Sequence, residues 1–329
     1  MMGYPSRQGT WQVIAVAAYI AMAQTPSAAQ DGYPNRLVKI IVPFPAGTTA
    51  DAIPRIVAEK LSARWSQPFI LENRPGATGN IGAELVARAE PDGYTLMSSA
   101  PPPLAINQSL YPKLAFDPSA FIAISLMAVV PNVLVVHPSV RANTLAELVA
   151  LAKSKPNELT YGSTGPGGTP QLTMEMLKLD SGATFRDIPY RRGTAPAVID
   201  LLGGRLDAMF VNISDVLPQI RAGGLKALGV STEKRIAELP DVPAIAETFP
   251  GFYSASWYAI MAPPRTPADI TSKLSAAVIE ALEMPDVNAK LREQSMIVTA
   301  YSPADTDAFI KKEIERWRKV IVAAGLKPE

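Results

Sequence analysis

The sequence contains no cysteine and only one histidine, His137, among its 329 residues. Thiolate nucleophiles, disulfides, cysteine–histidine zinc sites and paired-histidine metal sites are therefore excluded. The chain also has no large excess of basic or acidic residues, because 31 Lys and Arg stand against 30 Asp and Glu and the formal net charge is +1. Such a chain has no broad basic field to hold nucleic acid. We therefore expect no metal ion, no cofactor and no nucleic-acid partner.

Patterns of enzyme chemistry are equally scarce. His137 ends a strand-like run without a serine and an aspartate beside it, which favours a structural or exposed histidine over a general base. Gly-x-Ser-x-Gly is absent, and residues 231–234 (STEK) match Ser-x-x-Lys without the further motifs that β-lactamases need. The acids Asp51, Asp92 and Asp207 cannot be placed near one another from sequence. The chain is therefore not expected to be an enzyme.

Residues 1–29 have the pattern of a secretory signal peptide. Arg7 is followed by a short apolar run from Trp11 to Met22 and by the small residues at 27–29 (SAA), which suit signal cleavage. The run is shorter than the roughly 20 residues of a membrane-spanning helix. We expect cleavage near Gln30 and export of the mature chain, and an uncleaved apolar helix is the alternative.

Beyond the signal segment, short β-branched runs alternate with amphipathic stretches. The run at 37–42 (LVKIIV) predicts a strand, and the stretch 52–65 then places Ile53, Val57 and Leu61 on one helical face. Similar strand-like runs recur at 69–71, 94–98, 133–136, 159–161, 208–211 and 227–230, and further helices are expected at 81–89, 145–152, from 170, at 197–202 and at 305–323. Repeated strand–helix order predicts an α/β protein with parallel sheets covered by helices.

The length of the mature chain, roughly 300 residues, exceeds what one α/β core usually holds, so two domains are expected. No Gly/Ser-rich linker or charge block separates them. We therefore expect strands that cross between the domains, with the chain leaving the first domain and returning to it later. The boundaries are placed so that residues 30–131 and 250–329 form the first domain and residues 132–249 form the second.

The segment at 43–51 (PFPAGTTAD) lies between a predicted strand and a predicted helix. Such turns at the carboxyl edge of a parallel sheet bind ligands because backbone N–H groups and a helix N-terminus converge there. Gly47 permits close approach of the backbone, Thr48 and Thr49 offer hydroxyl groups, and Asp51 is a candidate helix cap. The segment predicts an anion site, and the alternative is a tight turn with a capped helix.

The segment at 161–172 (YGSTGPGGTPQL) repeats this arrangement, with Thr169 as the expected N-cap and Pro170 in the first helical turn. It completes neither a P-loop nor a Gly-x-Gly-x-x-Gly motif, so nucleotide binding has little support. A third segment places Tyr190, Arg191 and Arg192 before a predicted helix that starts near 194. An arginine here either pairs with a carboxylate or is solvated.

Five separated segments, in this order, carry a resemblance to a known family: YPNRLVKIIVPFPAGTTADAIPR, ENRPGATGNIGAELVARAEPDGYTL, YGSTGPGGTP, IPYRRGTAPAVIDLLGGRLD and LPDVPAIAETFPGF. The chain resembles the substrate-binding proteins of tripartite tricarboxylate transporters, also called Bug receptors, from Tyr33 to Gly325. The resemblance implies a monomeric periplasmic binding protein of the type II kind. Its two α/β lobes, joined by crossing strands, close over a small carboxylated solute. The implied partners are a large and a small integral membrane component.

The resemblance also carries ligand contacts onto the two loops, the strand end after DGYTL, the arginine segment and a following aspartate. These residues are Phe44, Ala46, Gly47, Thr48, Thr49, Asp51, Ser98, Ser99, Ser163, Thr164, Gly165, Gly167, Gly168, Thr169, Tyr190, Arg191 and Asp207. Arg191 or Arg192 is a candidate for the second carboxylate of a diacid. Departures from the family pattern, such as Thr48 for a usual Gly and Gln171 for a frequent His, leave the identity of the solute open.

Two facing helix N-termini, one from each lobe, would hold the carboxylate of such a solute without a buried lysine or arginine. Closure would follow, because only the closed form satisfies the ligand from both sides. One rival hypothesis is an exported hydrolase or isomerase that uses Asp51 or Asp207 as a base. Another is a binding protein that reports to a sensor.

Overall fold

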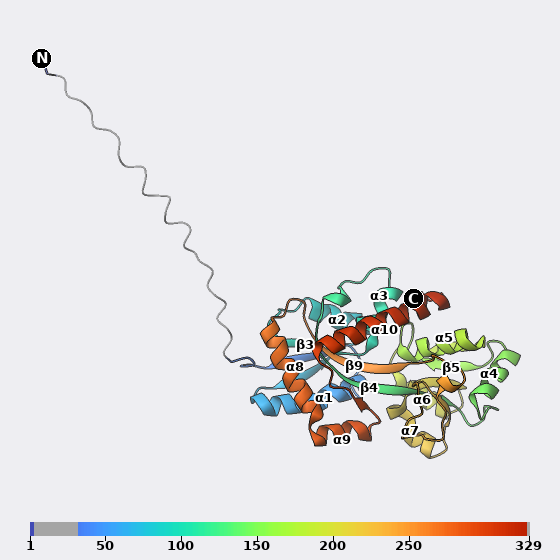
Figure 1. Cartoon of the computed structure of the whole chain (residues 1–329). Coiled ribbons are helices and arrows are strands. Elements are labelled where there is room, and N and C mark those ends of the chain that lie inside the picture. Colours follow the sequence, from blue (N-terminus) through green and yellow to red (C-terminus); the bar gives the residue numbers. More distant parts are fainter. Residues whose placement is uncertain (3–31, 328–329) are drawn as a thin grey trace.

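The computed structural model describes residues 1–2 and 32–327, so the expected signal segment at 1–29 lies outside the described residues apart from its first two. Helices pack on the faces of a long, continuous sheet, and the element order alternates strands with helices (Figure 1). This arrangement confirms the predicted α/β class. Within the described ranges, no helix has both the length and the apolar character needed to span a bilayer.

One half of the molecule, which we call the first lobe, contains the first three strands of the chain together with later ones. The strands are β1 (Val38–Val42), β2 (Phe69–Asn73), β3 (Thr95–Ser99), β9 (Ala255–Ala262), the first part of β4 (Ile122–Val136) and the short β10 (Ile297–Val298). Their order is β2-β1-β3-β9-β4, with β10 pairing to β4. The helices packed on them are α1 (Thr49–Trp65), α2 (Asn80–Ala87), α8 (Ala268–Glu283), α9 (Pro285–Glu293) and α10 (Pro303–Ala324).

The other half, the second lobe, is built around the end of β4. The strands are β5 (Thr160–Ser163), β6 (Arg186–Pro189), β7 (Ala208–Asn212) and β8 (Lys226–Val230), in the order β4-β7-β5-β6 with β8 also pairing to β4. The helices are α4 (Leu145–Ser154), α5 (Thr169–Ser181), α6 (Thr194–Leu202) and α7 (Ile213–Arg221). Short helical turns complete the chain: η1 (Ala77–Gly79), η2 (Pro102–Ile106), α3 (Asn107–Leu110), η3 (Pro118–Ala120) and η4 (Ile245–Glu247).

Strand β4 connects the two lobes. Its residues 122–131 pair with β9, and its residues 132–136 pair with β7. Only the end of this strand, 133–136, was expected from sequence, and the crossing that was inferred from the missing linker takes place within its 15 residues. The strands that join the lobes run antiparallel to their neighbours, so the sheets are mixed rather than parallel throughout. The domain boundaries after 131 and 249 stay a prediction.

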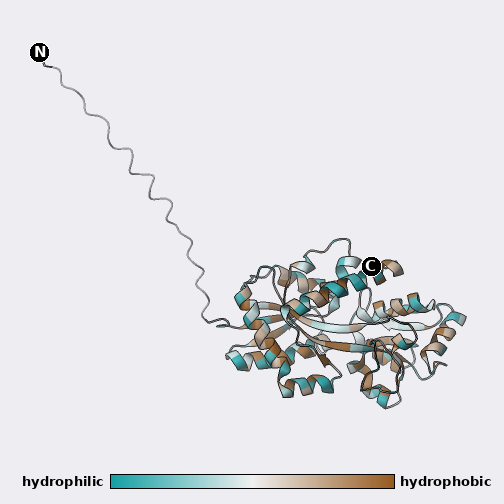
Figure 2. Ribbon diagram, viewed as in Figure 1, coloured by the Kyte–Doolittle hydropathy of each residue, from teal (hydrophilic) through white to brown (hydrophobic). Residues whose placement is uncertain are grey.

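The residues of β1 explain why this strand reads as a continuous apolar run. Ile40 packs into the core on the side of α1, whereas Ile41 packs into the core on the side of α2 and α10. A strand covered by helices on both faces needs apolar residues at every position. Figure 2 shows the consequence: brown dominates in parts of the central strands, and teal gathers on the covering helices.

Helix α1 begins three residues earlier than the predicted stretch 52–65, with Thr48 as its extended N-cap. Ile53, Val57 and Leu61 are buried in the core as the predicted helical face requires. The first turn was missed because Thr49 and Ala50 have no apolar periodicity. This turn reaches into the space between the lobes.

Candidate functional site

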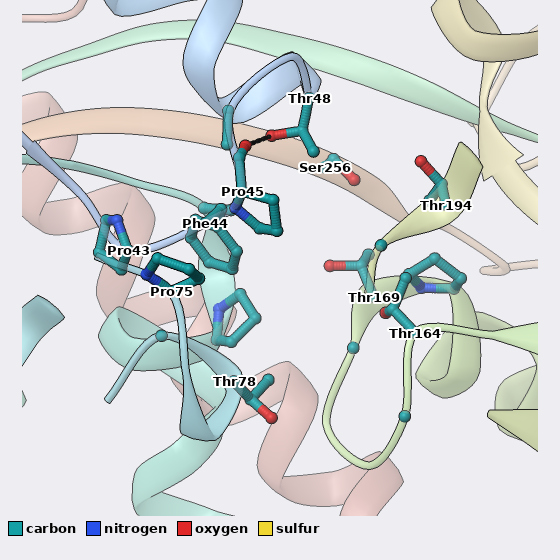
Figure 3. Close-up of a pocket in the computed structure, with 18 of the residues that line it drawn as sticks. Pro43, Phe44, Pro45, Thr48, Pro75, Thr78, Thr164, Thr169, Thr194 and Ser256 are labelled. Carbon is teal, nitrogen blue, oxygen red and sulfur yellow. Dashed lines mark hydrogen bonds between the residues drawn. The ribbon is translucent and has the colours of Figure 1, made fainter. Parts of the chain in front are cut away.

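A cavity of about 420 Å³ lies where the two lobes face each other (Figure 3). Its wall from the first lobe comes from the loops that follow β1, β2 and β3, and its wall from the second lobe comes from the loops that follow β5, β6 and β7. Strands β1–β3 run parallel to one another, and so do β5–β7. The carboxyl ends of both strand sets therefore open onto this cavity, where α/β folds place their ligands.

Four helices begin at the cavity. Thr49 starts α1, Thr169 starts α5 and Thr194 starts α6, and all three line the cavity, as does Asp215 in the first turn of α7. In Figure 3, Thr48 and Thr78 lie on one side, with Thr164, Thr169 and Thr194 on the other. The first turn of a helix carries unpaired N–H groups and about half a positive charge. The cavity wall is therefore built to receive negative charge from both lobes.

The side chain of Asp51 stabilises the loop at 43–48, which we call the first loop. Its carboxylate accepts a hydrogen bond from the Gly47 N–H at 3.0 Å, two from Arg55 at 2.9 and 3.0 Å, and one from the Asn73 amide at 3.0 Å. Burial raises the pKa of Asp51, but the hydrogen bonds from Arg55, Gly47 and Asn73 outweigh it and leave the pKa lowered. Asp51 thus stays ionised as a loop brace rather than a cap or a base.

The loop at 163–168, which we call the second loop, is stabilised in the same way, but by a neutral side chain. The side-chain carbonyl of Gln171 accepts a hydrogen bond from the Gly167 N–H at 2.9 Å. Asp51 and Gln171 occupy equivalent places, three residues after the N-caps Thr48 and Gly168 of α1 and α5. Gly47 and Gly167 also share a φ of +78°, the left-handed region that glycine enters without strain. Both loops therefore present their helix N-termini in the same way.

Hydrogen bonds cross the cavity between the lobes. Thr49 donates its hydroxyl to Asp215 at 3.2 Å and accepts a hydrogen bond from the Asn212 amide at 3.3 Å. Thr78 donates to the carbonyl oxygen of Pro166 at 3.3 Å. These bonds join α1 and η1 of the first lobe to α7, β7 and the second loop, so the structure has the lobes in contact.

The floor of the cavity is formed by β9. Ser256 and Tyr258 of this strand line the cavity, and the Tyr258 hydroxyl accepts a hydrogen bond from the Asn212 amide at 3.1 Å. Burial raises the pKa of Tyr258, with the nearby Asp215 adding to the rise, so its hydroxyl is neutral. A neutral hydroxyl on β9 offers a fixed polar contact at the base of the cavity.

Two charged side chains are among the described residues that line the cavity, Arg191 and Asp215. Asp215 is partly buried and receives hydrogen bonds from the hydroxyls of Thr49, Thr194 and Ser214. Burial raises the pKa of Asp215, and these hydroxyl bonds only oppose the rise. The remaining lining is apolar or neutral, with Phe44, Tyr111 and several prolines. Such a cavity suits a small solute with polar ends and an apolar middle.

The structure brings eight of the residues expected at the site to the cavity: Phe44, Thr48, Thr49, Thr164, Gly165, Gly168, Thr169 and Arg191. Ten others lie outside the described lining: Ala46, Gly47, Asp51, Ser98, Ser99, Ser163, Gly167, Tyr190, Arg192 and Asp207. The reasons are visible in their contacts. Asp207 accepts hydrogen bonds from the N–H and hydroxyl of Thr160 at 2.7 and 2.8 Å, and Tyr190 donates to Asp200 at 2.5 Å. Gly47 and Gly167 turn their N–H groups to Asp51 and Gln171.

Other lining residues were not singled out from sequence. They include Pro75–Gly79, Tyr111, Asn212, Asp215, Ser256 and Tyr258. Asn212 and Asp215 follow the strand expected at 208–211 and begin a helix, so the logic that identified the first two loops applies to them as well. Ser256 and Tyr258 carry no such local signal, because they lie within a strand.

A metal site finds no support in the side chains that the structure describes. No group of three His, Cys, Asp or Glu residues within residues 32–327 is arranged to hold a metal ion. The only histidine, His137, contacts Ser139 at 2.7 Å and lies away from the cavity lining. The chemistry of this cavity is therefore that of hydroxyls, backbone N–H groups and two side-chain charges.

Comparison with known proteins places this geometry in a family. Residues 53–326 match the model of the tripartite tricarboxylate transporter family receptor. BugT of Bordetella pertussis is 37% identical over 300 residues, which cover 90% of this chain and 92% of BugT.

Comparison with solved structures supports the same family. The R. palustris protein Rpa4515 with adipate has 36% identity and a TM-score of 0.85, covering 90% of this chain and 100% of that chain. MatC from Rhodopseudomonas palustris with bound malate has 30% identity and a TM-score of 0.81, covering 88% and 100%. The expected two-lobed fold of periplasmic binding proteins is confirmed by these likenesses. The chain therefore belongs to the tripartite tricarboxylate transporter receptor family.

Proposed function

We propose that this protein is an exported, periplasmic receptor. It binds a small carboxylated solute in the cavity between its lobes and delivers it unaltered to the large and small membrane components of a tripartite tricarboxylate transporter. The observation that carries this proposal is the convergence of helix N-termini from both lobes on one cavity, with α1 on one side and α5 and α6 on the other.

The energetics explain why two lobes are needed. Removing a carboxylate from water costs several kcal/mol unless it is well paired. Each hydrogen bond to a charged group returns roughly 1.5–3 kcal/mol, so two or three donors are required. The hydroxyls of Thr164 and Thr169 and the first-turn N–H groups of α1, α5 and α6 supply donors from both sides. The closed form is favoured because only it brings these donors together.

Arg191 gives the second lobe a further group for a diacid. It lines the cavity, whereas Arg192 lies outside the described lining. A guanidinium pairs with a carboxylate through two parallel hydrogen bonds. We assign the second carboxylate of a dicarboxylic solute to Arg191. Adipate in Rpa4515 and malate in MatC are both dicarboxylates, which supports this choice.

The division of the chain follows from the same proposal. Residues 30–131 and 250–329 form one moving body, residues 132–249 form the other, and β4 crosses between them. The change of partner along β4, from β9 to β7 after Pro131, supports the first boundary. Export by cleavage of residues 1–29 is part of the proposal and rests on the sequence pattern alone.

A binding screen tests the receptor function. Thermal unfolding is measured with mono-, di- and tricarboxylates and with neutral analogues, because a ligand at 100 times its Kd adds about 2.7 kcal/mol of stability. The ligand is then recovered after long incubation and identified by mass spectrometry. Stabilisation by an acid that is recovered unchanged is the expected result. Product formation would support a hydrolase or isomerase instead.

Delivery needs a separate test. Uptake of the labelled acid is measured in vesicles that contain the two membrane components, with and without this protein. The proposal predicts uptake only when the protein is present. An acid that binds tightly without restoring uptake would favour a receptor that reports to a sensor.

A further inference from the structure

Asp215 is the carboxylate that the described residues place in the wall of the cavity. Its position is unusual for a site that receives an acid. Two unit charges of like sign about 4 Å apart near a protein surface repel with an energy worth roughly a thousand-fold in affinity. A simple anion would therefore bind beside Asp215 at a large disadvantage.

The partners of Asp215 do not neutralise it. Thr49 and Ser214 donate to one oxygen at 3.2 and 3.3 Å, and Thr194 donates to the other at 3.2 Å. Hydroxyl donors to a carboxylate usually lie at 2.5–2.7 Å, so these three bonds are long. No lysine or arginine of residues 32–327 forms an ion pair with Asp215. The carboxylate thus keeps acceptor capacity toward the cavity.

From this geometry we infer that Asp215 is a specificity-determining residue that selects carboxylic acids carrying a protonated amine. The inference rests on the proposed function, because it describes a second contact in the same cavity. The ammonium group of the solute lies against Asp215 at the first turn of α7. Its carboxylate lies against the N-termini of α1 and α5. With a zwitterionic solute, an ion pair between the ammonium group and Asp215 therefore replaces the repulsion between two negative charges.

The environment of Asp215 agrees with this role. Burial raises the pKa of the Asp215 carboxyl, so the negative charge is costly until a cation arrives. An ammonium group supplies that cation together with three N–H donors. Thr194 is then free to rotate its hydroxyl toward the solute, because a hydroxyl serves as either donor or acceptor.

Matched pairs of acids test the inference by isothermal titration calorimetry at pH 7. Succinate is compared with L- and D-aspartate, and glutarate is compared with L- and D-glutamate. L-Malate, which has a hydroxyl in place of the amine, separates charge from simple hydrogen bonding. Each acid is titrated into the wild type, Asp215→Asn and Glu233→Gln, which removes one exposed negative charge outside the described lining.

The expected result is that one amino-bearing acid binds the wild type at least about tenfold more tightly than its plain diacid and than malate. Asp215→Asn should lose that preference, with unchanged or tighter binding of the plain diacid, and Glu233→Gln should keep it. Equal or tighter binding of the plain diacid by the wild type overturns the inference and leaves the proposed function standing. An equal loss of affinity for both acids in Asp215→Asn also overturns the inference and leaves the proposed function standing. If no carboxylate binds in the wider screen either, the proposed function fails and the inference falls with it.

Discussion

The hydroxyl of Thr49 at the start of α1 donates a hydrogen bond of 3.2 Å to Asp215 at the start of α7. Because α1 belongs to the first lobe and α7 to the second, this bond joins the lobes at the cavity wall. Thr49 also accepts a hydrogen bond from Asn212, so one buried side chain carries two contacts between the lobes.

Replacing Thr49 with valine should therefore loosen the closed form. Valine keeps the shape of the side chain and removes the hydroxyl, and each neutral hydrogen bond contributes about 1 kcal/mol. Losing two such bonds should shift the lobes toward an open arrangement and weaken acid binding about tenfold. Small-angle X-ray scattering reports the radius of gyration, and calorimetry reports the affinity.

Thr48→Val is the matched control for closure. Thr48 donates to the Pro45 carbonyl within its own loop, so its loss does not separate the lobes (Figure 3). If the two variants show the same radius of gyration, the contacts of Thr49 do not hold the lobes together.

Asp215→Asn should make the protein without added acid more stable at pH 7. The folded-state pKa of Asp215 is raised, so its protonated form stabilises the fold below the unfolded-state pKa. That stability is lost as the pH rises through the raised folded-state value. Asparagine is neutral at every pH and avoids the cost. Urea unfolding at several pH values should show a difference at pH 7 that disappears toward pH 3, and a difference independent of pH would contradict this explanation.

The glycines of the two loops form a matched pair for substitution. Gly47 and Gly167 both have φ of +78°, where an alanine costs roughly 1–2 kcal/mol. A Cβ on Gly47 meets no atom within 4 Å, whereas a Cβ on Gly167 would lie 2.7 Å from the side chain of Leu110. Gly167→Ala should therefore lose about 1–3 kcal/mol more stability than Gly47→Ala. Denaturant unfolding measures the stability of both variants. Equal losses of stability would show that the Leu110 side chain moves aside without cost.

The two neighbouring arginines should differ in their effect on a diacid. Arg191 lines the cavity and Arg192 does not belong to the described lining. Arg191→Gln should weaken a dicarboxylate about tenfold or more and a monocarboxylate much less, because a charge-assisted pair is lost only with the diacid. Arg192→Gln should leave both affinities nearly unchanged. Equal losses for both acids in Arg191→Gln would assign Arg191 to the first carboxylate or to the fold.

Sequence reasoning identified the loops of the candidate cavity whose signal is local in the sequence. The loops around Thr48 and Thr169 were found because a strand, a loop rich in Gly and Thr, and a helix follow one another within about ten residues. The roles within each loop were not accessible in this way. Whether the carboxylate of Asp51 turns outward to a ligand or back to Gly47 and Arg55 depends on the folded loop.

Residues brought together over long distances were missed. Ser256 and Tyr258 reach the cavity because β9 pairs with β4 and β3, which no local pattern reveals. The first part of β4 was missed for a related reason. Its residues are buried on both faces and show no alternation, and Pro131 interrupts the run in a way that argues against a strand.

A crystal structure with the acid found in the binding screen tests the central claim most directly. The account predicts carboxylate oxygens within hydrogen-bonding distance of donors at the N-terminus of α1 and at the N-terminus of α5, in one molecule with the lobes closed. A solute held by one lobe alone, or bound away from the cavity beside Thr49 and Thr169, would contradict it.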